Sequence, residues 1–126
     1  MSKIFCLAVI LSLVSIISAA TTKKPIPACA KCVNKAAGLI GASGAGTVTP
    51  TVKAVANTAA GCKRINVVCT TPADATKSSM EFNRSIGGPY EGKTVIATLT
   101  CGGNLKWHYT KAGKVIVVNS VGCMYV

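Results

Sequence analysis

Acidic residues and histidine are scarce in this sequence. Its 126 residues include three Asp and Glu and one His, against 14 Lys and Arg. General acid-base catalysis and histidine-based metal sites both depend on these side chains. The acids, Asp74, Glu81 and Glu91, show no spacing typical of a catalytic carboxylate pair, and no serine lies in a G-x-S-x-G nucleophile elbow. We therefore expect a protein that is not an enzyme, with no cofactor and no metal.

Aromatic residues are also few, and only one apolar run is long. The two Phe, one Trp and three Tyr leave nucleic-acid binding without stacking platforms, so we expect no nucleic-acid partner. The apolar run covers residues 4–17, after Met1-Ser2-Lys3 and before the small residues Ser18-Ala19-Ala20. About 14 residues are too short for the roughly 20 of a membrane-spanning helix. The run predicts a signal peptide over residues 1–20, a secreted, extracellular protein and no transmembrane segment after cleavage.

Cleavage after Ala20 leaves an even number of cysteines. It removes Lys3 and Cys6, so the mature chain has 106 residues, a formal charge of +10 and six cysteines. An even count in a small secreted protein is typical of a disulfide framework. The six cysteines are Cys29, Cys32, Cys62, Cys69, Cys101 and Cys123.

Cys29-Ala-Lys-Cys32 has the C-x-x-C spacing of redox and zinc motifs. A redox pair needs its first cysteine at a helix N-terminus after a strand, whereas Pro25 and Pro27 precede this one. A zinc site needs reduced thiolates and a second close ligand pair, which is missing. We expect structural disulfides instead.

The mature chain divides into a short leader and one domain. Residues 21–28 are polar and contain proline, which predicts an extended leader, and residues 29–126 form a single six-cysteine domain. Residues 33–61 are rich in Ala, Gly and Thr; they predict a flexible loop at 41–46 and a short helical turn within 52–60.

From Cys62 onward apolar and polar residues alternate with the period of half-buried strands. We expect strands at 63–70 and 78–84, and then a meander over 94–101, 104–110 and 114–123. Short strands at this spacing favour an all-β fold, a small disulfide-rich β-sandwich or open barrel of about five to seven strands with a loop-rich N-terminal segment. Phe82, Trp107 and Tyr109 are the candidate large core residues.

The strand pattern also bears on the cysteine partners. Cys69 and Cys101 are in phase with the apolar faces of their strands, which makes them candidates for a buried bridge packed by Trp107. Cys123 competes, because the third strand of an up-down-up meander ends near Cys101, where the first strand finished. Six cysteines allow fifteen connectivities, and this reasoning does not choose among them.

The cysteine order and its landmarks resemble a known family. The matching features are Cys29-x-x-Cys32, Gly61-Cys62, Val67-Val68-Cys69, Glu81-Phe82-Asn83, Thr98-Leu99-Thr100-Cys101, Trp107-His108-Tyr109 and Val121-Gly122-Cys123. This order is similar to the six-cysteine domain of secreted nematode proteins over residues 29–123. The resemblance implies an extracellular module with no catalytic residues and no established molecular function.

The resemblance also implies one bridge. In that family, the copies that lack the first cysteine also lack the third, which suggests that these two form a bridge. Carried over, this proposes Cys29–Cys62 here and leaves three pairings of the other four cysteines.

Two polar residues have alternative interpretations. Asn83-Arg84-Ser85 is the only N-x-[Ser/Thr] sequon, so Asn83 is either a glycosylation site or a structural residue beside Phe82. His108 is the sole histidine; it lies on the predicted polar face of its strand and is expected to be incidental.

The positive charge is the main functional signal, because it favours anionic partners. Lys106, Lys111 and Lys114 would cluster on one hairpin, although lysines are spread through the chain. We expect a secreted, disulfide-stabilised module with a structural or binding role, whose partners are anionic glycans or extracellular proteins. The alternative is a cationic defence effector that binds anionic surfaces, which requires a basic face beside exposed apolar surface.

Overall fold

The computed structural model describes residues 25–33 and 38–126. The predicted signal peptide and the first four residues of the predicted leader lie outside the described residues. Residues 25–27 are exposed and precede a short 3-10 helix, η1 (Ala28–Ala30). Within the described part of the chain no helix is long and apolar enough to cross a membrane.

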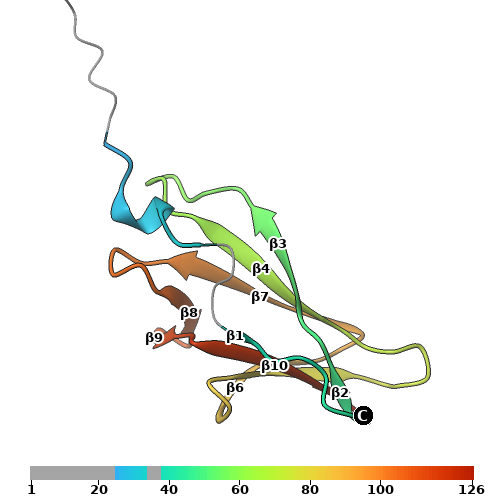
Figure 1. Cartoon of the computed structure of the whole chain (residues 1–126). Coiled ribbons are helices and arrows are strands. Elements are labelled where there is room, and N and C mark those ends of the chain that lie inside the picture. Colours follow the sequence, from blue (N-terminus) through green and yellow to red (C-terminus); the bar gives the residue numbers. More distant parts are fainter. Residues whose placement is uncertain (1–24, 34–37) are drawn as a thin grey trace, which may run out of the picture.

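Two five-stranded β-sheets form a small sandwich (Figure 1). Sheet A has the order β1-β10-β5-β6, and β2 also pairs with β10; sheet B has the order β3-β4-β7-β8-β9. The strands of sheet A are β1 (Gly38–Leu39), β2 (Thr47–Val48), β5 (Ser78–Phe82), β6 (Ile86–Gly92) and β10 (Ser120–Tyr125). Those of sheet B are β3 (Thr51–Val55), β4 (Arg64–Thr70), β7 (Thr94–Cys101), β8 (Trp107–Lys111) and β9 (Lys114–Val117). The all-β, disulfide-rich sandwich expected from the sequence is confirmed.

Alternating side chains of both sheets form the core. β4 and β7 pair over seven residues, from Arg64 opposite Thr100 to Thr70 opposite Thr94, and this pairing turns Ile65 and Leu99 inward, where both are fully buried. Burying each such side chain stabilises the folded state by about 1.5–3 kcal/mol relative to leaving it exposed.

Three aromatic side chains lie in this core or pack against it. Phe82 and Trp107 are buried, and Tyr109 is half-buried against the core. The rings of Phe82 and Tyr109 are 5.0 Å apart between centroids and tilted by 56°. This tilted contact between β5 and β8 connects sheet A to sheet B.

Four sequence-based boundaries are wrong. The strand expected at 104–110 begins at Trp107 as β8, because Leu105 has a positive φ angle of 62°. The helical turn expected within 52–60 is replaced over Thr51–Val55 by β3, since pairing with β4 overrides the helix propensity of its alanine. The strand expected at 78–84 ends at Phe82, because Asn83 and Arg84 adopt positive φ angles of 54° and 62°. The strand expected at 114–123 is two strands in two different sheets, β9 and β10.

The break between β9 and β10 changes the cysteine pairing. Val118 still donates its backbone N–H to the Trp107 carbonyl of sheet B, whereas from Ser120 onward the chain joins sheet A. Cys123 therefore lies in the sheet opposite Cys101, and the expectation that it ends near Cys101 in the same meander is wrong.

Three disulfides use all six cysteines of the predicted mature chain. Cys29 is joined to Cys62, Cys32 to Cys101 and Cys69 to Cys123. The first is the pair that the family resemblance implies. The candidate bridge between Cys69 and Cys101 is wrong: both cysteines lie in sheet B, and the bridge between the sheets is Cys69–Cys123.

Candidate functional site

The residues that could serve catalysis lie on different parts of the sandwich. Asp74 is in the loop between β4 and β5. Glu81 is on the outer face of sheet A, since its strand neighbours Met80 and Phe82 are buried, and His108 is on the outer face of sheet B, next to the buried Trp107. Glu91 belongs to β6. The structure does not bring Asp74, Glu81 and His108 together, and no group of three metal-binding side chains occurs among the described residues.

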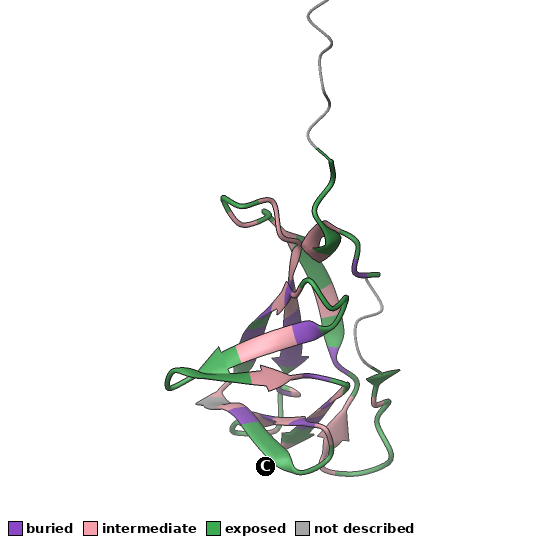
Figure 2. Cartoon of the chain, turned by 90° about the vertical axis from the view of Figure 1, so that its left-hand side faces the viewer, coloured by how far each residue is buried: buried purple, intermediate pink, exposed green. Residues whose placement is uncertain are grey.

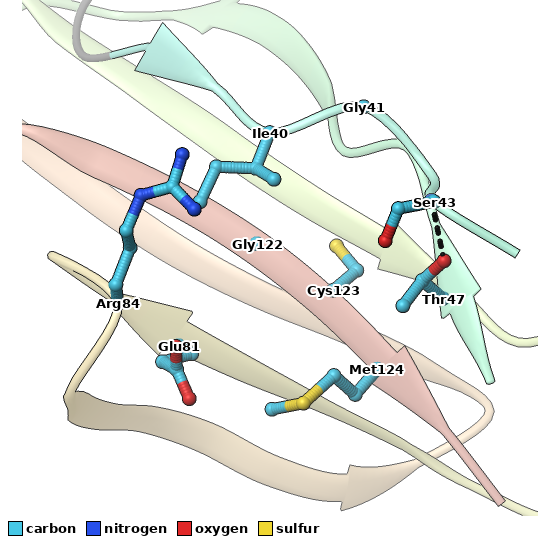
Figure 3. Close-up of a pocket in the computed structure, with 9 residues that line it drawn as sticks. All are labelled: Ile40, Gly41, Ser43, Thr47, Glu81, Arg84, Gly122, Cys123 and Met124. Carbon is cyan, nitrogen blue, oxygen red and sulfur yellow. Dashed lines mark hydrogen bonds between the residues drawn. The ribbon is translucent and has the colours of Figure 1, made fainter.

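A shallow cavity lies on the outer face of sheet A (Figure 3). Its volume is about 280 Å³, and the segment 40–47 forms one wall while β5 and β10 form its floor. Figure 3 shows the Arg84 guanidinium pointing towards Ile40, with Glu81 on β5 and Met124 on β10. The cavity has one carboxylate and one guanidinium, which is too little to define a ligand.

Asn83 occupies the turn after β5, and its side-chain amide makes three hydrogen bonds to backbone groups. Its Nδ2 donates to the Val117 carbonyl at 2.8 Å, and its Oδ1 accepts from the backbone N–H groups of Asn119 and Ser120 at 2.6 and 3.3 Å. These contacts hold the point where the chain passes from sheet B to sheet A. The side chain thus has a structural role, while its glycosylation stays a prediction.

The most distinctive arrangement is at one end of the sandwich, where two disulfides meet. We call this region the disulfide end: η1 with its flanking residues 25–33, the start of β4, and the β7–β8 loop 102–106. Cys29–Cys62 and Cys32–Cys101 tie the first segment to the other two. The Lys63 N–H donates to the Cys29 carbonyl at 2.8 Å, and Trp107 Nε1 donates to the Val33 carbonyl at 3.2 Å. Figure 1 shows η1 and the end of β7 on the same side of the molecule.

The β7–β8 loop has a fixed, strained shape. Backbone hydrogen bonds run from Gly102 to the Lys106 carbonyl and from Leu105 to the Gly102 carbonyl, at 2.8 and 3.0 Å. Leu105 has a φ angle of 62°, a backbone conformation that bulky side chains rarely adopt. Glycine suits position 102, because a Cβ there would lie 2.2 Å from the His108 ring as it stands and would force that side chain to move. This loop presents Leu105 to solvent, with 55% of its surface exposed.

Cations and exposed apolar side chains share the disulfide end. Lys31 and Lys106 are exposed, and Lys63 and Arg64 are half-buried. Lys63 Nζ donates to the Cys32 carbonyl at 3.0 Å, and Arg64 Nε donates to the Ala56 carbonyl at 2.8 Å. Because both groups are held by neutral carbonyls, their positive charge is not cancelled. The exposed apolar residues are Ile26, Val33 and Leu105.

The comparisons with known proteins give no relative. No protein-family model, no curated protein and no solved structure matches the chain. The function therefore has to be argued from the geometry of the disulfide end and from the distribution of charge.

Sequence reasoning placed the charged residues differently. The expected cluster of Lys106, Lys111 and Lys114 on one hairpin is divided, because Lys106 precedes β8 while Lys111 and Lys114 face each other at the far end of the β8–β9 hairpin. Lys111 Nζ donates to the Gly87 carbonyl of β6 at 3.4 Å. Sequence reasoning missed the disulfide end because its parts are separated by about 30 to 70 residues. They meet through disulfides that the strand pattern did not predict. The one local signal was Lys63-Arg64 directly after Cys62.

Proposed function

We propose that this protein is a secreted binding module without catalytic activity. The observation that carries the proposal is that three disulfides use all six cysteines left after the predicted cleavage. Such a framework persists in oxidising compartments and is rare in the cytosol. The separate positions of Asp74, Glu81 and His108 support the absence of acid-base chemistry.

The proposal includes membership of the six-cysteine domain family of secreted nematode proteins. Its support is the cysteine order together with the Cys29–Cys62 bridge, which the resemblance implies and the structure contains. A chain of this family acts outside the cell, and we propose extracellular anionic partners for it because of the charge of +10.

A direct test is to express the whole chain in secreting eukaryotic cells and to analyse the protein from the medium. Mass spectrometry without reduction should find an N-terminus at Thr21, no free thiol and the three observed bridges. Free thiols in the secreted protein, or retention of the whole chain inside the cell, would contradict the proposal.

A cationic defence effector is the second candidate. It requires basic and apolar surface side by side, and one observation favours it: exposed Lys31 and Lys106 share the disulfide end with exposed Val33 and Leu105. A growth-inhibition assay on bacteria with anionic envelopes tests it, and no effect at micromolar protein concentrations would remove it.

A further inference from the structure

We propose that the disulfide end docks on the surface of an anionic phospholipid bilayer. Ile26, Val33 and Leu105 enter the headgroup region, and the surrounding cations contact lipid phosphates. The inference rests on the binding function proposed above and names its partner.

The first argument is the arrangement of apolar side chains. Ile26, Val33 and Leu105 are 68%, 70% and 55% exposed, although they belong to segments more than 70 residues apart. The Cys32–Cys101 bridge and the bond from Trp107 to Val33 hold these segments together. Figure 2 looks at the molecule from this side, with exposed residues in green. Apolar residues held in place before binding lose little conformational entropy when they insert.

The second argument is the strain at Leu105. A left-handed conformation is unfavourable for a non-glycine residue, and glycine or asparagine would reduce that cost. The loop instead has an exposed leucine at this position, where it contributes nothing to the core. Strained backbone conformations cluster at functional sites, and insertion into an apolar phase is a function that leucine serves and asparagine does not.

The third argument is the charge around these anchors. Lys31, Lys63, Arg64 and Lys106 surround the disulfide end, and the hydrogen bonds that hold Lys63 and Arg64 go to backbone carbonyls. The three acidic residues of the sequence all lie between 74 and 91, in the β4–β5 loop, β5 and β6. Each basic residue near an anionic lipid surface contributes about 1 kcal/mol.

A bilayer fits this surface better than a sulfated polysaccharide does. A polysaccharide satisfies the cations but provides no apolar phase for Leu105 and Val33. Ile96 on the outer face of sheet B is also exposed, but its neighbours on the same face of the strand are the uncharged Thr94 and Thr98 rather than cations. Basic residues around apolar anchors are typical of proteins that lie in the membrane interface.

The test measures sedimentation of the secreted, disulfide-bonded protein with vesicles. Vesicles of phosphatidylglycerol and phosphatidylcholine are compared with pure phosphatidylcholine at low salt, for the parent protein and four variants. Leu105→Asn removes the anchor and relieves the strained φ, so it should fold at least as well as the parent. Its matched control, Ile96→Thr, removes an exposed apolar residue from the middle of sheet B. Lys106→Gln is matched by Lys77→Gln, which changes an exposed lysine before β5.

We expect preference for the anionic vesicles, weakened by added salt. Leu105→Asn should lower the partition coefficient about fivefold, the effect of about 1 kcal/mol of lost apolar burial, and Lys106→Gln should lower it about fivefold through lost lipid attraction. Both controls should stay within about twofold of the parent. A thermal midpoint of Leu105→Asn at or above that of the parent shows that lost binding is not lost folding.

Equal binding to neutral vesicles, or full binding by Leu105→Asn, would overturn the inference. So would retention on a sulfated-polysaccharide column that depends on Lys106 without any binding to vesicles. Those results leave the proposed binding module intact provided the three disulfides are present, whereas free thiols would remove the proposed function itself.

Discussion

Asn83 is a single side chain on which the junction of the two sheets depends. One amide serves three backbone groups, those of Val117, Asn119 and Ser120, at the point where β9 of sheet B gives way to β10 of sheet A. Asparagine also tolerates the positive φ angle of this position better than most residues. The residue therefore combines two requirements that no other amino acid meets equally well.

We predict that Asn83→Ala lowers the free energy of unfolding by about 3 kcal/mol, because it leaves two donors and one acceptor without partners and because alanine tolerates the positive φ angle less well than asparagine. Urea denaturation followed by Trp107 fluorescence measures it. Ser85→Ala is the matched control, since it removes the glycosylation sequon but keeps Asn83. Equal losses in the two variants would contradict the structural role, and a mass difference between the parent and Ser85→Ala would reveal a glycan.

The sequence located this residue but could not decide its role. Its sequon is visible in three consecutive letters, whereas its partners Val117 and Asn119 lie 34 and 36 positions further along. The same limit applies to Leu105, whose apolar side chain fits the alternation of a strand beginning at 104. Nothing local reveals that its φ angle is positive and its side chain exposed.

At the scale of elements, the β8–β9 hairpin has an unfavourable residue in its turn. Lys111 and Lys114 pair across a two-residue connection, and Ala112 and Gly113 within it have φ angles of 49° and 77°. Two positive φ angles define a type I′ turn, for which Asn-Gly is preferred.

Ala112→Asn should therefore raise the free energy of unfolding by about 0.5–1 kcal/mol, since asparagine adopts the left-handed conformation at lower cost than alanine. Thermal and urea unfolding measure the change. Gly113→Ala provides the reciprocal comparison and should be destabilising by a similar or larger amount. A loss of stability in Ala112→Asn would show that the turn needs something other than the backbone conformation.

Local alternation predicted β4, β5, β7, β8 and the span of β9 and β10, but it missed β1, β2, β3 and β6 and could not assign strands to sheets. The pairing of β7 with β8 and of β8 with β9 follows from short turns at 102–106 and 112–113. The division of 114–123 into β9 and β10 does not follow from the sequence pattern, because Val117 and Val121 are both apolar although they lie in different sheets. The change of sheet depends on Asn83. β3 was missed because Ala-rich segments pair as strands only when a neighbour such as β4 is available.

At the scale of the whole molecule, two disulfides serve the disulfide end and one joins the sheets. Cys69 and Cys123 are buried in opposite sheets, while Cys29 within η1 and its partner Cys62 are half-buried. Their sequence separations are 54 and 33 residues. A chain-entropy estimate gives about 4 kcal/mol of stabilisation for each bridge, so loop length does not make one bridge more important than the other. We expect the difference in their burial to decide which loss disrupts the fold.

We predict that the double replacement Cys69→Ala with Cys123→Ala disrupts the packed fold. It adds a cavity between the sheets to the lost cross-link, and together these approach the 5–15 kcal/mol that is typical of a whole domain. Cys29→Ala with Cys62→Ala should cost only about 2–4 kcal/mol and leave both sheets packed, because it frees η1 at the surface. Near-ultraviolet circular dichroism and urea unfolding distinguish the outcomes.

The same pair of variants links stability to binding. Without the Cys29–Cys62 bridge, Val33 stays tied to the β7–β8 loop by Cys32–Cys101 and the bond to Trp107, but Ile26 should move away from Leu105. The variant should therefore keep its near-ultraviolet spectrum yet bind anionic vesicles more weakly than the parent, by about threefold or more for one lost apolar anchor. Leu105→Asn added to that variant should then lower binding less than it does in the parent, since the two changes act on one surface. Fully additive losses would mean that η1 and the β7–β8 loop bind independently, and the disulfide end would not be a single docking surface.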